Sequence, residues 1–166
     1  KYVKGGYLQK LDDFSATHCV NEHFLEKLKI LNGTYVLPLS VNYRGIFYNK
    51  RMLEKDGYQI PSTYAELIQT MQQIKKAGKL PIVFADKDSW TLHQGWDAID
   101  MSSRGSQDNL FQNVLNGTTV LYEDPIALDS TRKFLEIRQY GQKQTINTGY
   151  DEAVKKFAKG EAYMFL

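Results

Sequence analysis

The stretch from residue 86 to residue 90 brings together side chains of two complementary types. Asp86 and Asp88 stand two positions apart, and Trp90 follows in the same polar segment. A Trp face offers a flat apolar surface to the C–H face of a sugar ring, while carboxylates accept hydrogen bonds from hydroxyl groups. At about 25 cal/mol/Å² of buried area, one stacked Trp face contributes on the order of 2–3 kcal/mol. Because this is too little for firm binding, further polar groups must take part.

The same stretch allows two other interpretations. In the first, the Trp90 ring folds back onto the preceding strand and has only a packing role. In the second, Asp86 and Asp88 are the paired carboxylates of a glycoside hydrolase. Glycoside hydrolysis needs two positioned carboxyl groups whose pKa values are pushed apart, and the sequence shows no independent second carboxylate. We therefore predict that the chain is not an enzyme, and a hydrolase stays the less favoured alternative.

Other kinds of chemical site find no support in the sequence. There is no GxGxxG or Walker sequence for phosphate binding and no GxSxG nucleophile elbow. The three His residues do not form an HExxH zinc motif. Cys19 lies beside His18, but a catalytic pair also needs a third group that orients the base. We predict no catalytic residue, no metal and no cofactor.

The composition indicates a globular protein. The chain has 166 residues, of which 42% are hydrophobic and 24% charged. Lys and Arg total 21 against 19 Asp and Glu, and a net charge of +2 predicts no nucleic-acid partner. The longest apolar runs are too short for a transmembrane helix. The chain starts at Lys1 without a signal peptide and stops in the apolar run 162–166, so we expect it to be a fragment.

Helical and extended patterns alternate along the chain, which predicts an α/β fold. The clearest helix opens with a capping box formed by Thr63 and Glu66 and ends at Gly78. Helices are expected over residues 21–31, 50–56, 63–77, 91–103, 106–115, 129–140 and 150–159, and strands over residues 34–41, 45–49, 80–85 and 162–166.

The candidate residues follow a strand that we expect to be buried. Residues 80–85 are almost entirely apolar, as in a strand covered on both faces. In open α/β sheets, ligands bind at the carboxyl ends of the strands. The loop from Asp86 to Trp90 is therefore the first place to expect a ligand site.

Several stretches resemble one known family. Residues 32–41, 45–55 and 60–67 resemble, in order and in approximate spacing, the family 1 extracellular solute-binding proteins of carbohydrate ABC transporters. Residues 157–164 resemble that family's FxxGxAAM stretch, and residues 11–14 resemble the loop before its first crossing between lobes. The resemblance covers nearly the whole chain.

The resemblance implies a type II periplasmic-binding-protein-like fold with two α/β lobes joined by a hinge. Residues 1–40 would be the end of the first lobe and the hinge strand, and residues 41–166 would be part of the second lobe. It also implies that a carbohydrate is held between the lobes and delivered to the membrane permease of an ABC importer. A fragment is then expected to bind sugar weakly or not at all. Because a fold does not fix its ligand, a non-sugar solute or a protein partner stays an alternative.

The resemblance also implies a set of ligand contacts. Asp88 and Trp90 match an acidic and an aromatic contact of the family, and Asn42 matches a contact position at which the family has a carboxylate. Tyr43 and Arg44 adjoin Asn42. The predicted ligand-binding set is Trp90, Asp88, Asn42, Tyr43, Arg44 and Asp86. The family further implies an extracellular or periplasmic location, as a cell-surface lipoprotein whose lipid anchor is missing from this chain.

Overall fold

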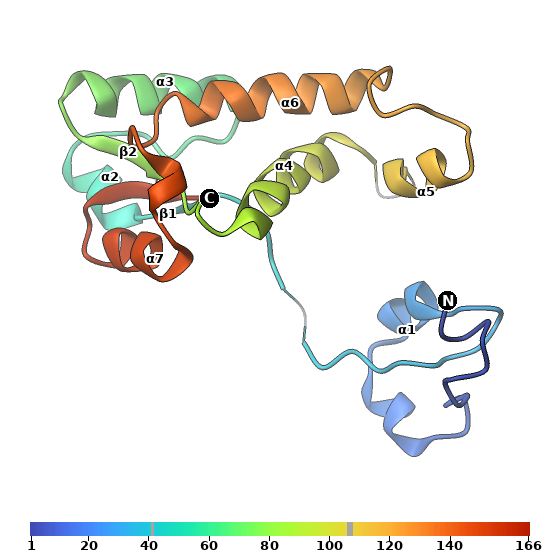
Figure 1. Cartoon of the computed structure of the whole chain (residues 1–166). Coiled ribbons are helices and arrows are strands. Elements are labelled where there is room, and N and C mark those ends of the chain that lie inside the picture. Colours follow the sequence, from blue (N-terminus) through green and yellow to red (C-terminus); the bar gives the residue numbers. More distant parts are fainter. Residues whose placement is uncertain (41, 106–107) are drawn as a thin grey trace. The chain divides into compact units, whose positions relative to one another are not determined.

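The computed structural model describes residues 1–40, 42–105 and 108–166. These residues form two compact units, Lys1–Tyr43 and Arg44–Leu166. Figure 1 shows the elements of each unit. The predicted segment 41–166 begins at Val41, which lies outside the described residues. That the two units belong to two different lobes stays a prediction.

The first unit holds two short helical segments, the 3-10 helix η1 (Ser15–Cys19) and α1 (Glu22–Leu28). Asn21 caps α1, because its Oδ1 accepts a hydrogen bond from the backbone N–H of His23 at 3.0 Å. The helix predicted over residues 21–31 is therefore confirmed at its start and ends three residues early.

The segment after α1 differs from the prediction. Leu31 and Asn32 take positive φ values of 50° and 58°, and Gly33 forms an antiparallel bridge with Ile30. The described residues 34–40 form no strand. Thr34 instead hydrogen-bonds to the segment near Leu11, and the Pro in this stretch supplies no N–H for a strand ladder.

The second unit is built on a three-stranded sheet of order β1–β3–β2. The strands are β1 (Phe47–Tyr48), β2 (Leu80–Val83) and β3 (Ala162–Phe165). β2 and β3 run parallel, and β1 pairs antiparallel with β3. Three of the four predicted strands are thus confirmed, each somewhat shorter than expected.

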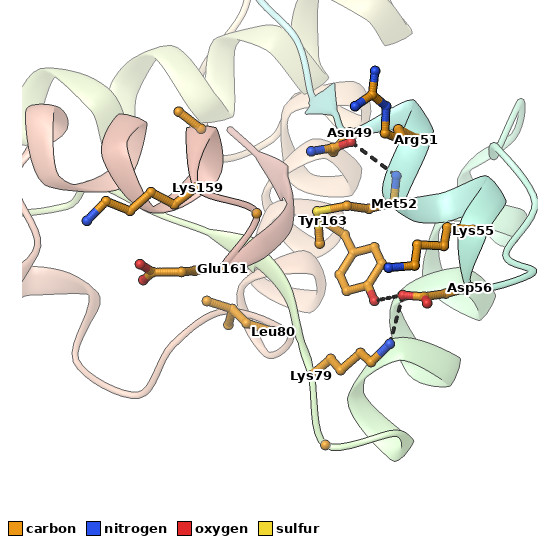
Figure 2. A pocket seen from close by; sticks show the side chains of 13 residues that line it. Asn49, Arg51, Met52, Lys55, Asp56, Lys79, Leu80, Lys159, Glu161 and Tyr163 are labelled. Atoms are coloured by element: carbon orange, nitrogen blue, oxygen red, sulfur yellow. Dashed lines mark hydrogen bonds and ion pairs between the residues drawn. The ribbon is translucent and has the colours of Figure 1, made fainter.

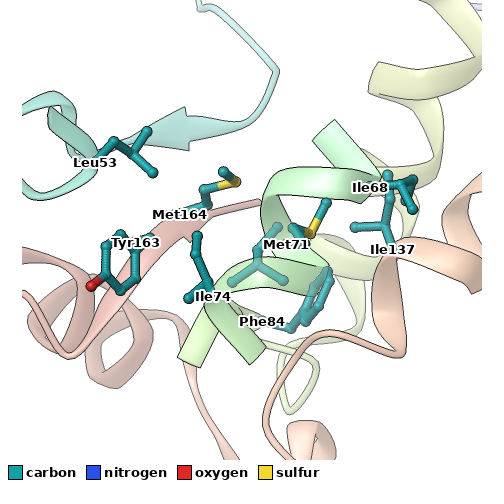
Figure 3. Close-up of a cluster of buried hydrophobic side chains, with 9 residues drawn as sticks. Leu53, Ile68, Met71, Ile74, Phe84, Ile137, Tyr163 and Met164 are labelled. Atoms are coloured by element: carbon teal, nitrogen blue, oxygen red, sulfur yellow. The ribbon is translucent and has the colours of Figure 1, made fainter. Parts of the chain in front are cut away.

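Helices cover both faces of this sheet (Figure 1). On one face lie α3 (Tyr64–Lys76) and α6 (Pro125–Arg138), and on the other lies α7 (Tyr150–Ala158). The alternation along β2 and the residues after it sends Ile82 and Phe84 into one buried cluster and Val83 and Ala85 into the other. Figure 3 shows the first cluster, to which α2 (Lys50–Lys55) adds Leu53.

The helix signals of the sequence are confirmed where capping is strongest. The side chain of Thr63 accepts from the backbone N–H of Glu66, whose carboxylate accepts in return from the backbone N–H of Thr63. Gly57, Gly78 and Gly160 follow the ends of α2, α3 and α7 and have φ near +75°. Glycine reaches this conformation without steric cost, which explains why the helices stop there.

Two predicted helices are present but begin at other residues than expected, and one further helical turn was not predicted. α4 spans Ser89–Ser103 and α5 spans Leu110–Leu115. Of the helix predicted over 106–115, residues 106 and 107 lie outside the described residues. η2 (Thr145–Asn147) is a further 3-10 turn. No helix in the described ranges is both long and apolar enough to cross a bilayer.

α6 begins four residues before the helix predicted over residues 129–140, so the predicted start is wrong. The helix starts at Pro125, a residue whose fixed φ suits the first helical position. Asp124 is the cap, and its Oδ1 accepts from the backbone N–H of Ala127 at 2.8 Å. Asp129 lies inside the helix, where its carboxylate pairs with Lys133 at 2.6 Å.

A buried ion cluster joins the end of α4 to the start of α6. The side chain of Arg104 is only 3% exposed. Its guanidinium donates to Asp100 at 2.6 and 3.1 Å, to Asp108 at 3.0 Å, and to both oxygens of Asp124. The hydrogen bond from Arg104 lowers the pKa of Asp124 below its ordinary value. Because Asp124 also caps α6, the cluster fixes two helix ends with one side chain.

We expect the Arg104→Ala substitution to lower the free energy of unfolding by about 3–5 kcal/mol, because it leaves three carboxylates clustered without their cation. Urea denaturation measures this loss. Arg132→Ala is the matched control: Arg132 also pairs with Asp129, but on an exposed surface, where an ion pair contributes little. Equal losses in the two variants would contradict the structural role of the buried cluster.

Candidate functional site

The loop that follows β2 leads directly into α4 at the carboxyl end of the parallel strands. Asp86 and Asp88 lie in this loop, and Trp90 stands in the first turn of α4. The first residue of α7, Tyr150, lies beside the same loop. Two helix N-termini therefore meet where the sequence predicts a ligand.

Asp88 connects the two helices. It is the N-cap residue of α4, yet its side chain caps a different helix: Oδ2 accepts a hydrogen bond from the backbone N–H of Tyr150 at 2.7 Å. A carboxylate at a helix N-terminus also interacts favourably with the helix dipole. Within the described residues, Oδ1 of Asp88 accepts no hydrogen bond from the protein. One oxygen thus holds the helices together, and the other is available.

Trp90 and Tyr150 form an exposed aromatic pair. Their ring centroids are 5.0 Å apart and their planes are inclined by 48°. Trp90 is 47% and Tyr150 40% exposed, so the Trp90 ring is not buried in the core as one interpretation required. Tyr150 also contacts the ring of Phe165 in β3, at 5.8 Å between centroids. The pair is therefore supported from the sheet and open to solvent.

Sequence reasoning identified Tyr150 only as the start of a helix. It lies 62 residues from Asp88, and a contact between residues so far apart in the chain leaves no periodic or spacing signal. Only the folded sheet, which brings α7 next to α4, shows that Tyr150 belongs to the site.

A hollow of about 600 Å³ lies beside the aromatic pair. Its charged lining residues are two cations, Lys87 and Lys155, and three carboxylates, Asp88, Asp151 and Glu152. The partial positive charge of two helix N-termini offsets the small excess of negative charge. A site with nearly balanced charge, an aromatic wall and several polar groups suits a neutral polar ligand.

Asp86 has a different environment from Asp88. It is buried, and its two oxygens accept hydrogen bonds from the guanidinium of Arg138 at 3.0 and 2.5 Å. Arg138 ends α6 and also donates to Oγ1 of Thr145 at 3.1 Å. Asp86 therefore fixes the base of the loop to α6. The ligand contact predicted for Asp86 stays a prediction, with both oxygens already engaged by Arg138.

The remaining predicted residues lie at the junction of the two units. Asn42 and Tyr43 are exposed and end the first unit, and Arg44 begins the second. Nη1 of Arg44 donates to Oδ2 of the buried Asp97 in α4 at 2.8 Å. That Asn42, Tyr43 and Trp90 face one crevice stays a prediction.

The amino ends of the same strands enclose a second hollow, of about 790 Å³ (Figure 2). The buried Tyr163 donates a hydrogen bond to Asp56, which pairs with Lys79 at 2.7 Å. The bond from Lys79 lowers the pKa of Asp56, and burial raises the pKa of Tyr163. α2, α3 and α7 all end around this hollow, so the Lys side chains there complement negative helix ends. These polar groups satisfy one another, which indicates a scaffold.

Metal chemistry has no visible basis in the described parts of the chain. Among residues 1–40, 42–105 and 108–166, no three His, Cys, Asp or Glu side chains are grouped so that they can hold a metal ion.

The chain is similar over its full length to solute-binding proteins. The sequence profile of the family described as bacterial extracellular solute-binding protein matches residues 1–166. The multiple sugar-binding protein of Streptococcus mutans serotype c is 24% identical over 169 residues, which cover 99% of this chain and 40% of that protein. An ABC transporter extracellular-binding protein of Pyrococcus horikoshii is also 24% identical, over 100% of this chain and 38% of its own length.

Solved structures agree with this similarity. The solute-binding protein RafE in complex with raffinose is 26% identical, with a TM-score of 0.80 over 99% of this chain and 44% of RafE. A chitin oligosaccharide binding protein is 24% identical and shares the fold, with a TM-score of 0.82 over 99% of this chain and 42% of that protein. The type II periplasmic-binding-protein-like fold is thus confirmed. The chain spans about 40% of the length of the relatives it matches.

The two loop carboxylates are expected to differ in their effect on stability. Asp86→Asn breaks a buried ion pair with Arg138 and should lower the free energy of unfolding by about 3 kcal/mol. Asp88→Asn keeps an oxygen that caps α7 and should change it by no more than about 0.5 kcal/mol, because Asn and Asp cap helices about equally well. Urea denaturation of both variants compares them directly. A larger loss for Asp88→Asn would reverse the assigned roles.

Proposed function

This chain belongs to the family of bacterial extracellular solute-binding proteins, and on that premise we propose that it binds a neutral carbohydrate at the hollow beside Trp90 and Tyr150. The observation that carries this proposal is the exposed aromatic pair next to Asp88, at the carboxyl end of the parallel strands. In the whole protein, the bound sugar is passed to the membrane permease of an ABC importer, outside the cytoplasm. The lipid anchor stays a prediction.

The chemistry of the hollow favours a sugar over other solutes. Covering the half-exposed Trp90 ring with an apolar sugar face is favourable, because it removes apolar area from water. The free oxygen of Asp88 accepts a hydrogen bond from a sugar hydroxyl. Nearly balanced charge disfavours a polyamine or a strongly charged peptide. The names of two similar proteins point the same way, since one is called a multiple sugar-binding protein and the other holds raffinose.

Hydrolysis is not supported by the geometry. A glycosidase places two free carboxyl groups on either side of the scissile bond. In this loop Asp86 is engaged by Arg138, and Asp88 caps α7. The members of the family with similar sequences and structures are named as binding proteins, and binding without turnover is the role we propose here.

The site on the second unit alone predicts weak binding. One stacked face contributes about 2–3 kcal/mol, and one or two hydrogen bonds add about 0.5–1.5 kcal/mol each. A Kd of about 1 mM corresponds to 4.1 kcal/mol. The 166-residue chain is therefore expected to bind a sugar in the millimolar range.

Tryptophan fluorescence tests the proposal at one residue. The chain has two Trp residues, and Trp96 donates to Oγ1 of Thr131 at 2.9 Å, away from the exposed pair. In Trp96→Phe only Trp90 emits, and titration with raffinose should give a saturating change in its emission. In the matched variant Trp90→Phe, the emission of Trp96 should not respond. Trp90→Ala should weaken binding by about 30- to 150-fold, as measured by calorimetry.

Three results would contradict the proposal. The first is an equal response of Trp90 and Trp96, which would indicate a change that is not local to the site. The second is saturation by spermidine or a dipeptide where raffinose and chitin oligosaccharides have no effect, which would favour a non-sugar solute. The third is release of the chromophore from an aryl glycoside, lost in Asp88→Asn, which would favour the hydrolase.

A further inference from the structure

We propose that His93 of α4 and Phe111 of α5 form a second stacking subsite, which makes the ligand an oligosaccharide; this inference rests on the function proposed above. The two rings lie 6.2 Å apart between centroids, with their planes inclined by 36°. The side chain of His93 is 62% exposed and Phe111 is 52% exposed. A second aromatic surface is thus open to solvent, and its His93 ring belongs to the helix that presents Trp90.

The two aromatic surfaces follow each other along one helix face. Trp90 and His93 are three residues apart in α4, so their side chains leave the same side of the helix. The axial rise between them is about 4.5 Å, which is comparable to the step from one pyranose ring to the next in an oligosaccharide. A sugar chain that stacks one ring on Trp90 can therefore place a neighbouring ring over His93 and Phe111.

A buried carboxylate lies beside the imidazole of His93. Oδ2 of Asp97, one helical turn further along α4, lies 3.3 Å from Nδ1 of His93. This close polar contact favours one orientation of the ring. Fixing a ring before the ligand arrives lowers the entropy cost of binding.

Arg44 completes this arrangement. Its Nη1 donates to the same oxygen of Asp97 at 2.8 Å, and the Asp97 side chain is only 7% exposed. Arg44 itself is partly exposed, so its other N–H groups can donate to sugar hydroxyls. The charges of Arg44 and Asp97 compensate each other, which suits a neutral oligosaccharide as well as the hollow beside Trp90 does.

Sugars of different length distinguish the contribution of the second subsite from that of the first. All variants are made in the Trp96→Phe background, and galactose and raffinose are titrated while Trp90 emission is recorded. Phe111→Ala should weaken raffinose binding by about five- to tenfold and leave galactose binding within about twofold. Leu115→Ala, which removes another exposed apolar side chain of α5, should change neither.

A pair of substitutions at His93 isolates its ring from its contact with Asp97. Both His93→Ala and His93→Phe lose the polar contact with Asp97, but only His93→Phe keeps an aromatic surface. We expect His93→Phe to retain more of the raffinose affinity than His93→Ala does. Near-UV circular dichroism confirms that each variant is folded.

The outcomes distinguish this inference from the proposed function. If Phe111→Ala leaves raffinose binding unchanged, or weakens both sugars equally, the second subsite is wrong and the site at Trp90 stands. Binding to Trp90→Ala is measured by calorimetry, because this variant lacks the reporting indole. If Trp90→Ala has no effect on either sugar, or neither sugar binds the parent chain, the proposed function fails and the subsite fails with it.

Discussion

A single hydrogen bond between a side chain and the backbone determines the geometry of the candidate site. The carboxylate of Asp88 ends the loop after β2 and accepts from the first N–H of α7. This contact joins two helix N-termini that are 62 residues apart in sequence. Because Tyr150 is itself the donor and Trp90 lies two residues after Asp88, the two rings come to lie 5.0 Å apart between centroids. Without it, the sequence would present two isolated aromatic residues in place of one continuous wall.

The direction of the parallel strands separates the two ends of the sheet chemically. α3 and α7 each lead into a parallel strand, so both helices end at the amino ends of the strands, and α4 begins where β2 has ended. Negative helix ends gather around the hollow at the amino ends of the strands, where Lys79 and other cations compensate them. Positive helix ends gather around the hollow beside Trp90, where Asp88 lies. The carboxyl end thus combines uncapped donors, a carboxylate and aromatic rings, which is the chemistry that a polyhydroxylated ligand needs.

Local signals in the sequence predicted the loop but only half of the site. A buried strand followed by a polar turn predicted that Asp88 and Trp90 lie at the carboxyl edge of the sheet. The capping box at Thr63 predicted the start of α3 correctly. The start of α6 was predicted four residues late, because Pro125 suits the first helical position and selects Asp124 as the cap. Tyr150 was missed because its role arises from a tertiary contact. Sequence patterns predict the helix or strand to which a residue belongs, whereas an aromatic surface such as that of Trp90 and Tyr150 forms between residues of different elements.

A stacking surface on one unit can account for the choice of ligand, but it cannot by itself account for a change of conformation on binding. A ligand shifts an equilibrium between two conformations only by the difference in its affinity for them. The rings of Trp90 and Tyr150 contact each other, and Asp88 is fixed by α7 within the second unit, so these groups offer the same contacts in any arrangement of the two units. If they bind the ligand as we propose, they contribute to affinity in every conformation and favour none. In the function proposed here, the recognition signal for a permease must come from contacts that only one conformation adds. The chain spans about 40% of the length of the relatives it matches, so contacts from the rest of the whole protein can supply that signal.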